Sequence, residues 1–147
     1  MKKILVIVLA VIFMGTVAAK PAVKPEARVL SAFQKDFIGT ANVNWSSDNE
    51  FYYVSFEMNG EKIHAVYTKE DASFVGYANL IREDHLPSLL RNELNSHFSN
   101  YKVSGRVLEV VYEDSSAYEL VLENEKEIIR VRLQDDTTTV LSRLKKM

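Results

Sequence analysis

Two segments of the chain place apolar residues at helical spacing. In the first, which starts at Glu26, apolar residues recur every three or four positions, at Val29, Leu30, Phe33, Phe37 and Ile38. Gly39 follows, where a glycine is expected to end a helix. The second segment, 86–98, has the same pattern at Leu89, Leu90, Leu94 and Phe98. Pro87 suits its first turn, because proline needs no amide partner there. We therefore predict two amphipathic helices.

Segments rich in β-branched and aromatic residues follow each helix. Phe51–Met58 and Glu61–Thr68 flank Asn59-Gly60, a pair that accepts the positive φ angles of a tight hairpin turn. Later in the chain, two further strand-like segments flank Asn124-Glu125, which we predict to be a second two-residue turn. Each hairpin is expected to have one strand before it and one after it. The six predicted strands besides Phe51–Met58 and Glu61–Thr68 are 43–47, 73–80, 106–112, 117–123, 126–133 and 138–145.

The two halves of the chain share a pattern. Ile63 and Ile128 lie 65 positions apart, as do Val75 and Val140. Self-similarity at a fixed offset indicates a repeated structural unit, with copies at 26–82 and 83–147. Each unit is too small to bury both a helix stripe and a sheet face alone. We therefore predict an α+β fold, a single domain in which two helices pack on one face of one extended, curved antiparallel sheet.

Alternation along the hairpins separates a core face from an outer face. In the first hairpin the core face carries Tyr52, Val54, Phe56, Met58, Ile63, Ala65 and Tyr67. In the second, it carries Tyr118, Leu120, Leu122, Ile129, Val131 and Leu133. The outer faces carry aromatic, aliphatic and basic residues that suit a binding surface. The candidate binding residues are Phe51, Tyr53, His64, Val66, Arg130 and Arg132. The alternative is that these residues only reflect strand composition.

The N-terminus has the organisation of a secretory signal peptide. Lys2 and Lys3 precede an apolar run of 11 residues, 4–14, and small residues lead to a cleavage site after Ala19. Residues 20–25, with two prolines, are expected to form a flexible leader. The alternative is a membrane anchor, but a run this short lacks the roughly 20 apolar residues that span a bilayer. We predict a periplasmic or secreted protein.

Composition excludes several function classes. The chain has no cysteine, so it has no thiolate nucleophile, no cysteine-ligated metal site and no lipidated cysteine. Without Lys2 and Lys3, sixteen basic residues face twenty acidic ones, a net charge of −4. Nucleic-acid binding needs a concentrated basic face, so a nucleic-acid partner is not expected.

No catalytic or metal-binding motif stands out. His64, His85 and His97 are too scattered for a zinc site, and we predict no metal ion and no cofactor. Acid pairs occur at Glu70-Asp71, Glu83-Asp84 and Asp135-Asp136. Neighbouring acids on a turn usually face solvent, so they give weak support to acid–base catalysis. We predict that the protein is not an enzyme.

Several short motifs together carry a family resemblance. They are Phe37, Val43-Asn44-Trp45, Tyr53-Val54-Ser55-Phe56, Asn59-Gly60-Glu61-Lys62, Tyr67, Lys69-Glu70-Asp71, Leu86-Pro87 and Phe98-Ser99-Asn100-Tyr101-Lys102. With these, the chain from about Glu26 to Lys146 resembles the PepSY-like, β-lactamase-inhibitor-like family of small exported Bacteroidota proteins. The resemblance implies a tandem α/β repeat like that of the β-lactamase inhibitor protein. Asn124-Glu125 and Asp136-Thr137 depart from the glycine-bearing turns usual in that family.

Two functional hypotheses remain. The first is an exported, non-enzymatic binding module, inhibitor-like as the resemblance implies, that holds a protein or peptide of the cell envelope on the outer sheet face. The second is a structural or envelope-stress protein that self-associates through its sheet. Neither hypothesis needs a membrane anchor after signal cleavage, and the sequence does not predict the oligomeric state.

Overall fold

The computed structural model describes residues 22–135 and 137–147. The predicted signal peptide and the first residues of the leader lie outside the described residues, as does Asp136 of the third acid pair. Within the described part of the chain, no helix has the length and apolar character that crossing a membrane requires.

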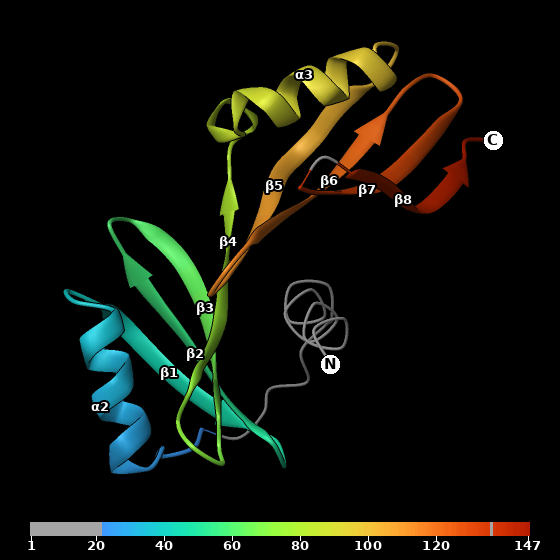
Figure 1. Cartoon of the computed structure of the whole chain (residues 1–147). Helices are drawn as coiled ribbons and strands as arrows, with labels where there is room; N and C mark the ends of the chain where they lie inside the picture. The colour runs from blue at the N-terminus through green and yellow to red at the C-terminus, as the bar shows by residue number, and fades with distance from the viewer. Residues whose placement is uncertain (1–21, 136) are drawn as a thin grey trace. The chain divides into compact units, whose positions relative to one another are not determined.

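The described elements are two α-helices, one short 3-10 helix and eight strands. The helices are α2 (Ala27–Asp36), η1 (Glu83–His85) and α3 (Ser88–His97). The strands are β1 (Ala41–Ser47), β2 (Phe51–Met58), β3 (Glu61–Thr68), β4 (Phe74–Ile81), β5 (Lys102–Tyr112), β6 (Ser116–Glu123), β7 (Glu127–Gln134) and β8 (Thr137–Lys145). They form an antiparallel sheet in chain order, β1 to β8 (Figure 1).

The chain divides into two compact units, which are described separately. The first contains α2, β1 to β3 and β4 as far as Asn79, together with the end of β5 and the turn after it, Val110–Asp114. The second contains η1, α3, most of β5, and β6 to β8. A helix followed by four strands thus occurs twice along the chain. The repeat boundary predicted between residues 82 and 83 stays a prediction.

The first hairpin has the predicted strands and turn. Phe51 pairs with Thr68 and Met58 with Glu61, which leaves Asn59 and Gly60 as the two turn residues. Both have positive φ angles, 55° and 79°, as a type I′ turn requires. The alternation of faces predicted for this hairpin is therefore confirmed.

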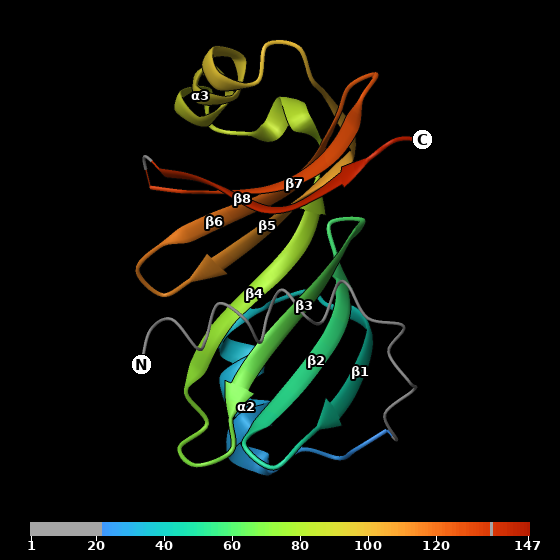
Figure 2. The ribbon, with the colours of Figure 1, turned by 90° about the vertical axis from the view of Figure 1, so that its right-hand side faces the viewer.

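Helix α2 covers the core face of the first hairpin, lying behind β1 to β3 in Figure 2. Its buried residues Val29 and Phe33 pack with the predicted core residues of β2 and β3. The Phe33 ring lies 5.1 Å from that of Phe56, edge to face. The prediction was wrong for Ile38, which is 82% exposed. The helix ends at Asp36, so Ile38 no longer follows the helical periodicity.

The second hairpin has the predicted faces but a different turn. Glu123 pairs with Ile128, so four residues lie between the last paired positions instead of two, and the last of them, Glu127, already belongs to β7. Asn124 closes this turn: its side-chain Oδ1 accepts hydrogen bonds from the amides of Lys126 and Glu127, both at 2.9 Å. Neither Asn124 nor Glu125 has a positive φ, which a type I′ turn would need. Two added turn residues leave the alternation unchanged, so the same side chains remain in the core.

The second core lies between α3 and the sheet. Its members are Leu86, Leu90, Leu94, Val107, Tyr118, Leu120, Leu122, Ile129, Val131 and Leu133. Leu89, which we predicted to belong to the apolar stripe, is 67% exposed. We predicted Pro87 in the first helical turn. In the structure it lies just before the helix, which begins at Ser88. Leu86, which precedes the helix with extended backbone angles, is buried in this core instead.

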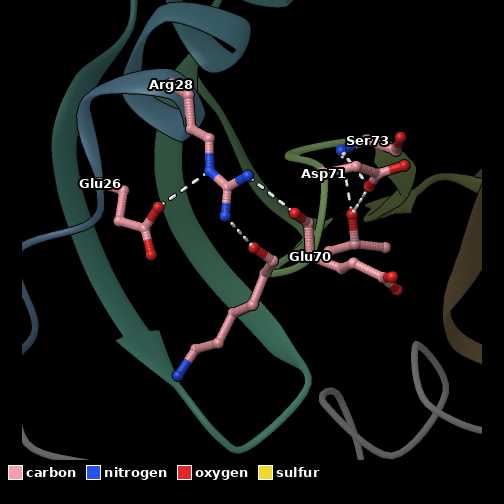
Figure 3. Close-up of polar contacts among 7 residues, drawn as sticks. Glu26, Arg28, Glu70, Asp71 and Ser73 are labelled. Atoms are coloured by element: carbon pink, nitrogen blue, oxygen red, sulfur yellow. Dashed lines mark hydrogen bonds and ion pairs between the residues drawn. The ribbon is translucent and has the colours of Figure 1, made fainter.

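Arg28 fastens α2 to the turn between β3 and β4 (Figure 3). Its Nη1 donates to the carbonyl oxygen of Glu70 at 2.7 Å and its Nη2 to that of Lys69 at 2.5 Å. In the same turn Asp71 accepts hydrogen bonds from the Thr68 hydroxyl and the Ser73 amide. These bonds lower the pKa of Asp71 to about 2. The acid pair Glu70-Asp71 thus contributes to the structure of a turn.

The contrast between Phe56 and Ile38 gives a stability prediction. Phe56→Ala should lower the free energy of unfolding by about 3–5 kcal/mol, because it leaves a cavity among closely packed rings. Ile38→Ala should change it by less than about 0.5 kcal/mol, because the side chain is already in solvent. Urea denaturation followed by circular dichroism measures both. Equal losses for the two variants would contradict the described core.

Candidate binding surface

The six predicted binding residues lie in both units. Phe51, Tyr53, His64 and Val66 belong to β2 and β3, whereas Arg130 and Arg132 belong to β7. The register places each group opposite the core face of its hairpin. We call the first group, with Ser55, the first outer face. The second outer face consists of Glu119, Val121, Glu123, Ile128, Arg130 and Arg132.

Val66 is not available as a binding residue. The predicted pairing of Tyr53 with Val66 is present, but Val66 is 0% exposed. The prediction treated the hairpin as if it stood alone. In the structure β3 is an inner strand, and Val66 also pairs with Gly76 of β4. The partly exposed residues of the first outer face are Phe51, Tyr53, Ser55 and His64.

Tyr53 is held in place by Asp48. Its hydroxyl donates to Asp48 Oδ2 at 2.5 Å, and its ring lies 6.4 Å from that of Phe51. Asp48 also accepts hydrogen bonds from the amides of Glu50 and Phe51, so it closes the turn between β1 and β2. Burial, reinforced by the bond to Asp48, raises the pKa of Tyr53 above its usual value. The first outer face therefore offers two neighbouring aromatic rings in a fixed arrangement.

His64 is neutral at physiological pH. Burial, together with the nearby positive charge of Lys62, lowers the pKa of its imidazole to about 4. His64 pairs in register with Ser55 on β2 and Ala78 on β4. A neutral imidazole both donates and accepts a hydrogen bond, so this position carries no charge towards a partner.

The second outer face contains a buried carboxylate between two arginines. Glu119 is only 5% exposed. Its Oε2 lies 3.2 Å from Arg130 Nη2, and its Oε1 accepts a hydrogen bond from Arg132 Nε at 2.9 Å and another from Arg132 Nη2. Arg132 lies directly across the strand pair from Glu119. Alternation along β6 places Glu119 on the outer face, where the two guanidinium groups bind its carboxylate.

The cluster of Glu119, Arg130 and Arg132 carries a net positive charge, and its side chains are held in place by their ion pairs. One carboxylate balances one of the two guanidinium groups, and both arginine side chains remain partly exposed. The buried Nε of Arg130 has no hydrogen-bond partner among the described residues. Guanidinium groups bind carboxylates through paired, planar hydrogen bonds. The second outer face can therefore hold an acidic group.

The remaining polar groups have structural roles. No cluster of three or more metal-ligating His, Cys, Asp or Glu side chains occurs in the described ranges. In the pair Glu83-Asp84, Asp84 accepts a hydrogen bond from Arg82 at 3.1 Å, which lowers its pKa. His97 lies beside Glu93 on the last turn of α3. Asp84 also lies 3.8 Å from His85 Nε2, and the side chains of Asp84, His85 and His97 are all exposed.

The lowered pKa of His64 predicts a pH dependence of stability. Its neutral form contributes stability above the unfolded pKa of about 6.5, and this contribution is lost as the pH falls towards about 4. His64→Gln, which does not titrate, should flatten the fall in melting temperature between pH 6.5 and 4. His97→Gln, at an exposed helix position, is the control. If both variants keep the wild-type pH profile, His64 is not the titrating group.

Neither a known sequence family nor a curated protein matches the chain. Solved structures do. A DUF2874 family protein from Bacteroides uniformis ATCC 8492 is 18% identical with a TM-score of 0.65, over 83% of this chain and 90% of that one. A BLIP-like protein from Bacteroides fragilis NCTC 9343 is 15% identical with a TM-score of 0.64, over 84% and 87%.

A third structure has the same fold. It is a protein of Bacteroides eggerthii DSM 20697, provisionally assigned to the periplasm, with 20% identity and a TM-score of 0.65 over 84% of this chain and 90% of that one. At these identities the likeness concerns the fold alone. The expectation of a β-lactamase-inhibitor-like fold is confirmed at that level, because the chain is similar in fold to DUF2874 and BLIP-like proteins of Bacteroides.

Proposed function

We propose that the protein is an exported, non-enzymatic binding module that holds a protein or peptide through the second outer face. The observation that carries the proposal is the cluster of Arg130 and Arg132 on the buried Glu119. Arginines fixed in this way are typical of binding surfaces, where a few anchors supply most of the affinity.

The cluster indicates the chemistry of the partner. Each arginine would normally lose side-chain freedom on binding, which costs about 0.5–1.5 kcal/mol per side chain. Here the bonds to Glu119 already restrict both guanidinium groups. Their surroundings are partly desolvated, so a carboxylate gains more from them than from an arginine in water. The partner is therefore expected to present an acidic side chain or a C-terminal carboxylate.

Export is supported by the sequence of residues 1–19 and by the provisional periplasmic assignment of a protein with the same fold. The BLIP-like description of another neighbour makes inhibition of an enzyme one form that the binding could take. We also propose that the protein is PepSY-like and that it arose by duplication, with copies at 26–82 and 83–147. The recurring order of one helix and four strands supports the duplication.

Capture from envelope extract tests the binding face. Removing the arginines alone would leave Glu119 buried without a partner, so the test variant combines Glu119→Gln, Arg130→Gln and Arg132→Gln. It changes the net charge by −1. Lys102→Gln, at an exposed residue of the same unit, makes the same change and is the matched control.

We expect the wild-type protein and the control to retain a defined envelope protein, and the triple variant to retain it at least about tenfold more weakly. Circular dichroism establishes that the triple variant is folded. Mass spectrometry identifies the retained protein. Equal retention by a folded triple variant would overturn the assignment of the face, and no retention by the wild type would overturn the binding function.

A further inference from the structure

The second outer face continues onto β8. The register between β7 and β8 places Ser142 opposite Arg130 and Leu144 opposite Ile128. Residues directly opposite each other in a strand pair share a face of the sheet. Ser142 and Leu144 therefore lie on the same face as the arginine cluster, and both are exposed.

Apolar side chains border Arg130 on this face. Val121 lies directly across from Arg130 on β6, and Ile128 and Leu144 form the cross-strand pair two positions along β7. Val121 and Ile128 are half-buried, whereas Leu144 is 66% exposed. A single exposed leucine is ordinary, but one that lies beside two further apolar side chains and a cation forms a patch. We call Val121, Ile128 and Leu144 the apolar strip.

Arg130 keeps donors for an acidic group. Arg132 donates to Glu119 from two nitrogens, Nε and Nη2, whereas Arg130 donates from one, Nη2, at 3.2 Å. The hydroxyl of Ser142, across the strand pair from Arg130, supplies a further donor at this position. An acidic group on this face is therefore expected at Arg130 and Ser142.

The acidic charge beside the apolar strip is already balanced. Glu123 lies directly across from Ile128, and its Oε1 accepts a hydrogen bond from Lys146 Nζ at 2.5 Å, which lowers the pKa of Glu123. A second acidic group of a ligand would meet this carboxylate, whereas an apolar group would contact Ile128 and Leu144. The face therefore suits one acidic group with one apolar group beside it.

The spacing along β7 sets the distance between these two groups. Arg130 and Ile128 are two residues apart on one strand, so their Cα atoms lie about 6.6–6.8 Å apart. An extended peptide has the same spacing between residues two positions apart, and their side chains point to one side. A peptide that lies along β7 can therefore place an acidic residue at Arg130 and an apolar residue on the apolar strip.

We propose that the second outer face binds an extended peptide segment in which an acidic residue and a large apolar residue lie two positions apart. The acidic side chain binds Arg130 and Ser142, and the apolar side chain packs on Ile128 and Leu144. This inference rests on the proposed function, because it uses the same face. It adds a role for β8 that the arginine cluster alone does not require.

Short peptides with blocked ends test the spacing. The probes are acetyl-Thr-Glu-Thr-Leu-Thr-amide and acetyl-Thr-Leu-Thr-Glu-Thr-amide, because a peptide can run along β7 in either direction. In the composition-matched control, acetyl-Thr-Glu-Leu-Thr-Thr-amide, the leucine points to the opposite side from the glutamate. In the charge control, glutamine replaces glutamate in each probe. NMR chemical-shift titration measures binding to the form that a bacterial cell produces from the full chain.

We expect one of the two probes to bind with a dissociation constant in about the millimolar range. The composition-matched control and the glutamine peptide should each bind at least about fivefold more weakly, because one loses the apolar contact and the other loses the charge.

A variant of the apolar strip tests the residues. Leu144→Ser should remove the preference for the spaced peptide over the composition-matched control and keep the preference for glutamate over glutamine. Leu89→Ser is the matched control, because Leu89 on α3 is 67% exposed, and it should bind the peptides as the wild type does. Circular dichroism establishes that both variants are folded.

The outcomes separate this inference from the proposed function. Equal binding of the spaced and composition-matched peptides, or equal behaviour of Leu144→Ser and Leu89→Ser, would overturn the peptide motif and leave the arginine cluster as a site for an acidic group. Equal binding of the glutamate and glutamine peptides would overturn the binding face as well. No binding of either probe up to about 10 mM would overturn the motif, whereas the capture experiment decides the proposed function independently.

Discussion

Each unit depends on the burial of one face of a β-hairpin beneath a short helix. Every second residue of the hairpin is committed to that core, from Tyr52 to Tyr67 in the first unit and from Tyr118 to Leu133 in the second. Helices of ten residues are marginal alone in water, so α2 and α3 depend on the same contact. A change of register by one residue would expose the core and bury the outer face.

Because every second hairpin residue is buried in the core, the residues between them, on the outer face, can have other roles. In the first unit they carry two aromatic rings, with Tyr53 bound to Asp48, and a neutral His64. In the second they carry a carboxylate that two arginines remove from water. A buried ion cluster adds little net stability over apolar residues of similar size, so the cluster is not needed to hold the hairpin together.

Strict alternation made the hairpin strands, their faces and both cores predictable from the sequence. Helix ends were less predictable. Ile38 and Leu89 continue the apolar spacing but are exposed, and the spacing does not show that α2 ends at Asp36 or that α3 begins only at Ser88. The burial of Val66 depends on β4, a neighbour that a single hairpin does not show. The burial of Glu119 was not predicted. Its position directly across from Arg132 in the strand pair is the signal that could have indicated an ion pair.

Arg130 and Arg132 are the proposed contact residues of a partner. The most direct measurement is the rate at which an arginine-specific reagent modifies each arginine, followed by mass spectrometry, with and without the captured partner. The partner should slow modification of Arg130 and Arg132 and leave the rate at Arg28 unchanged, because Arg28 is engaged by the turn at Lys69 and Glu70. Unchanged rates at Arg130 and Arg132 in the complex would contradict it.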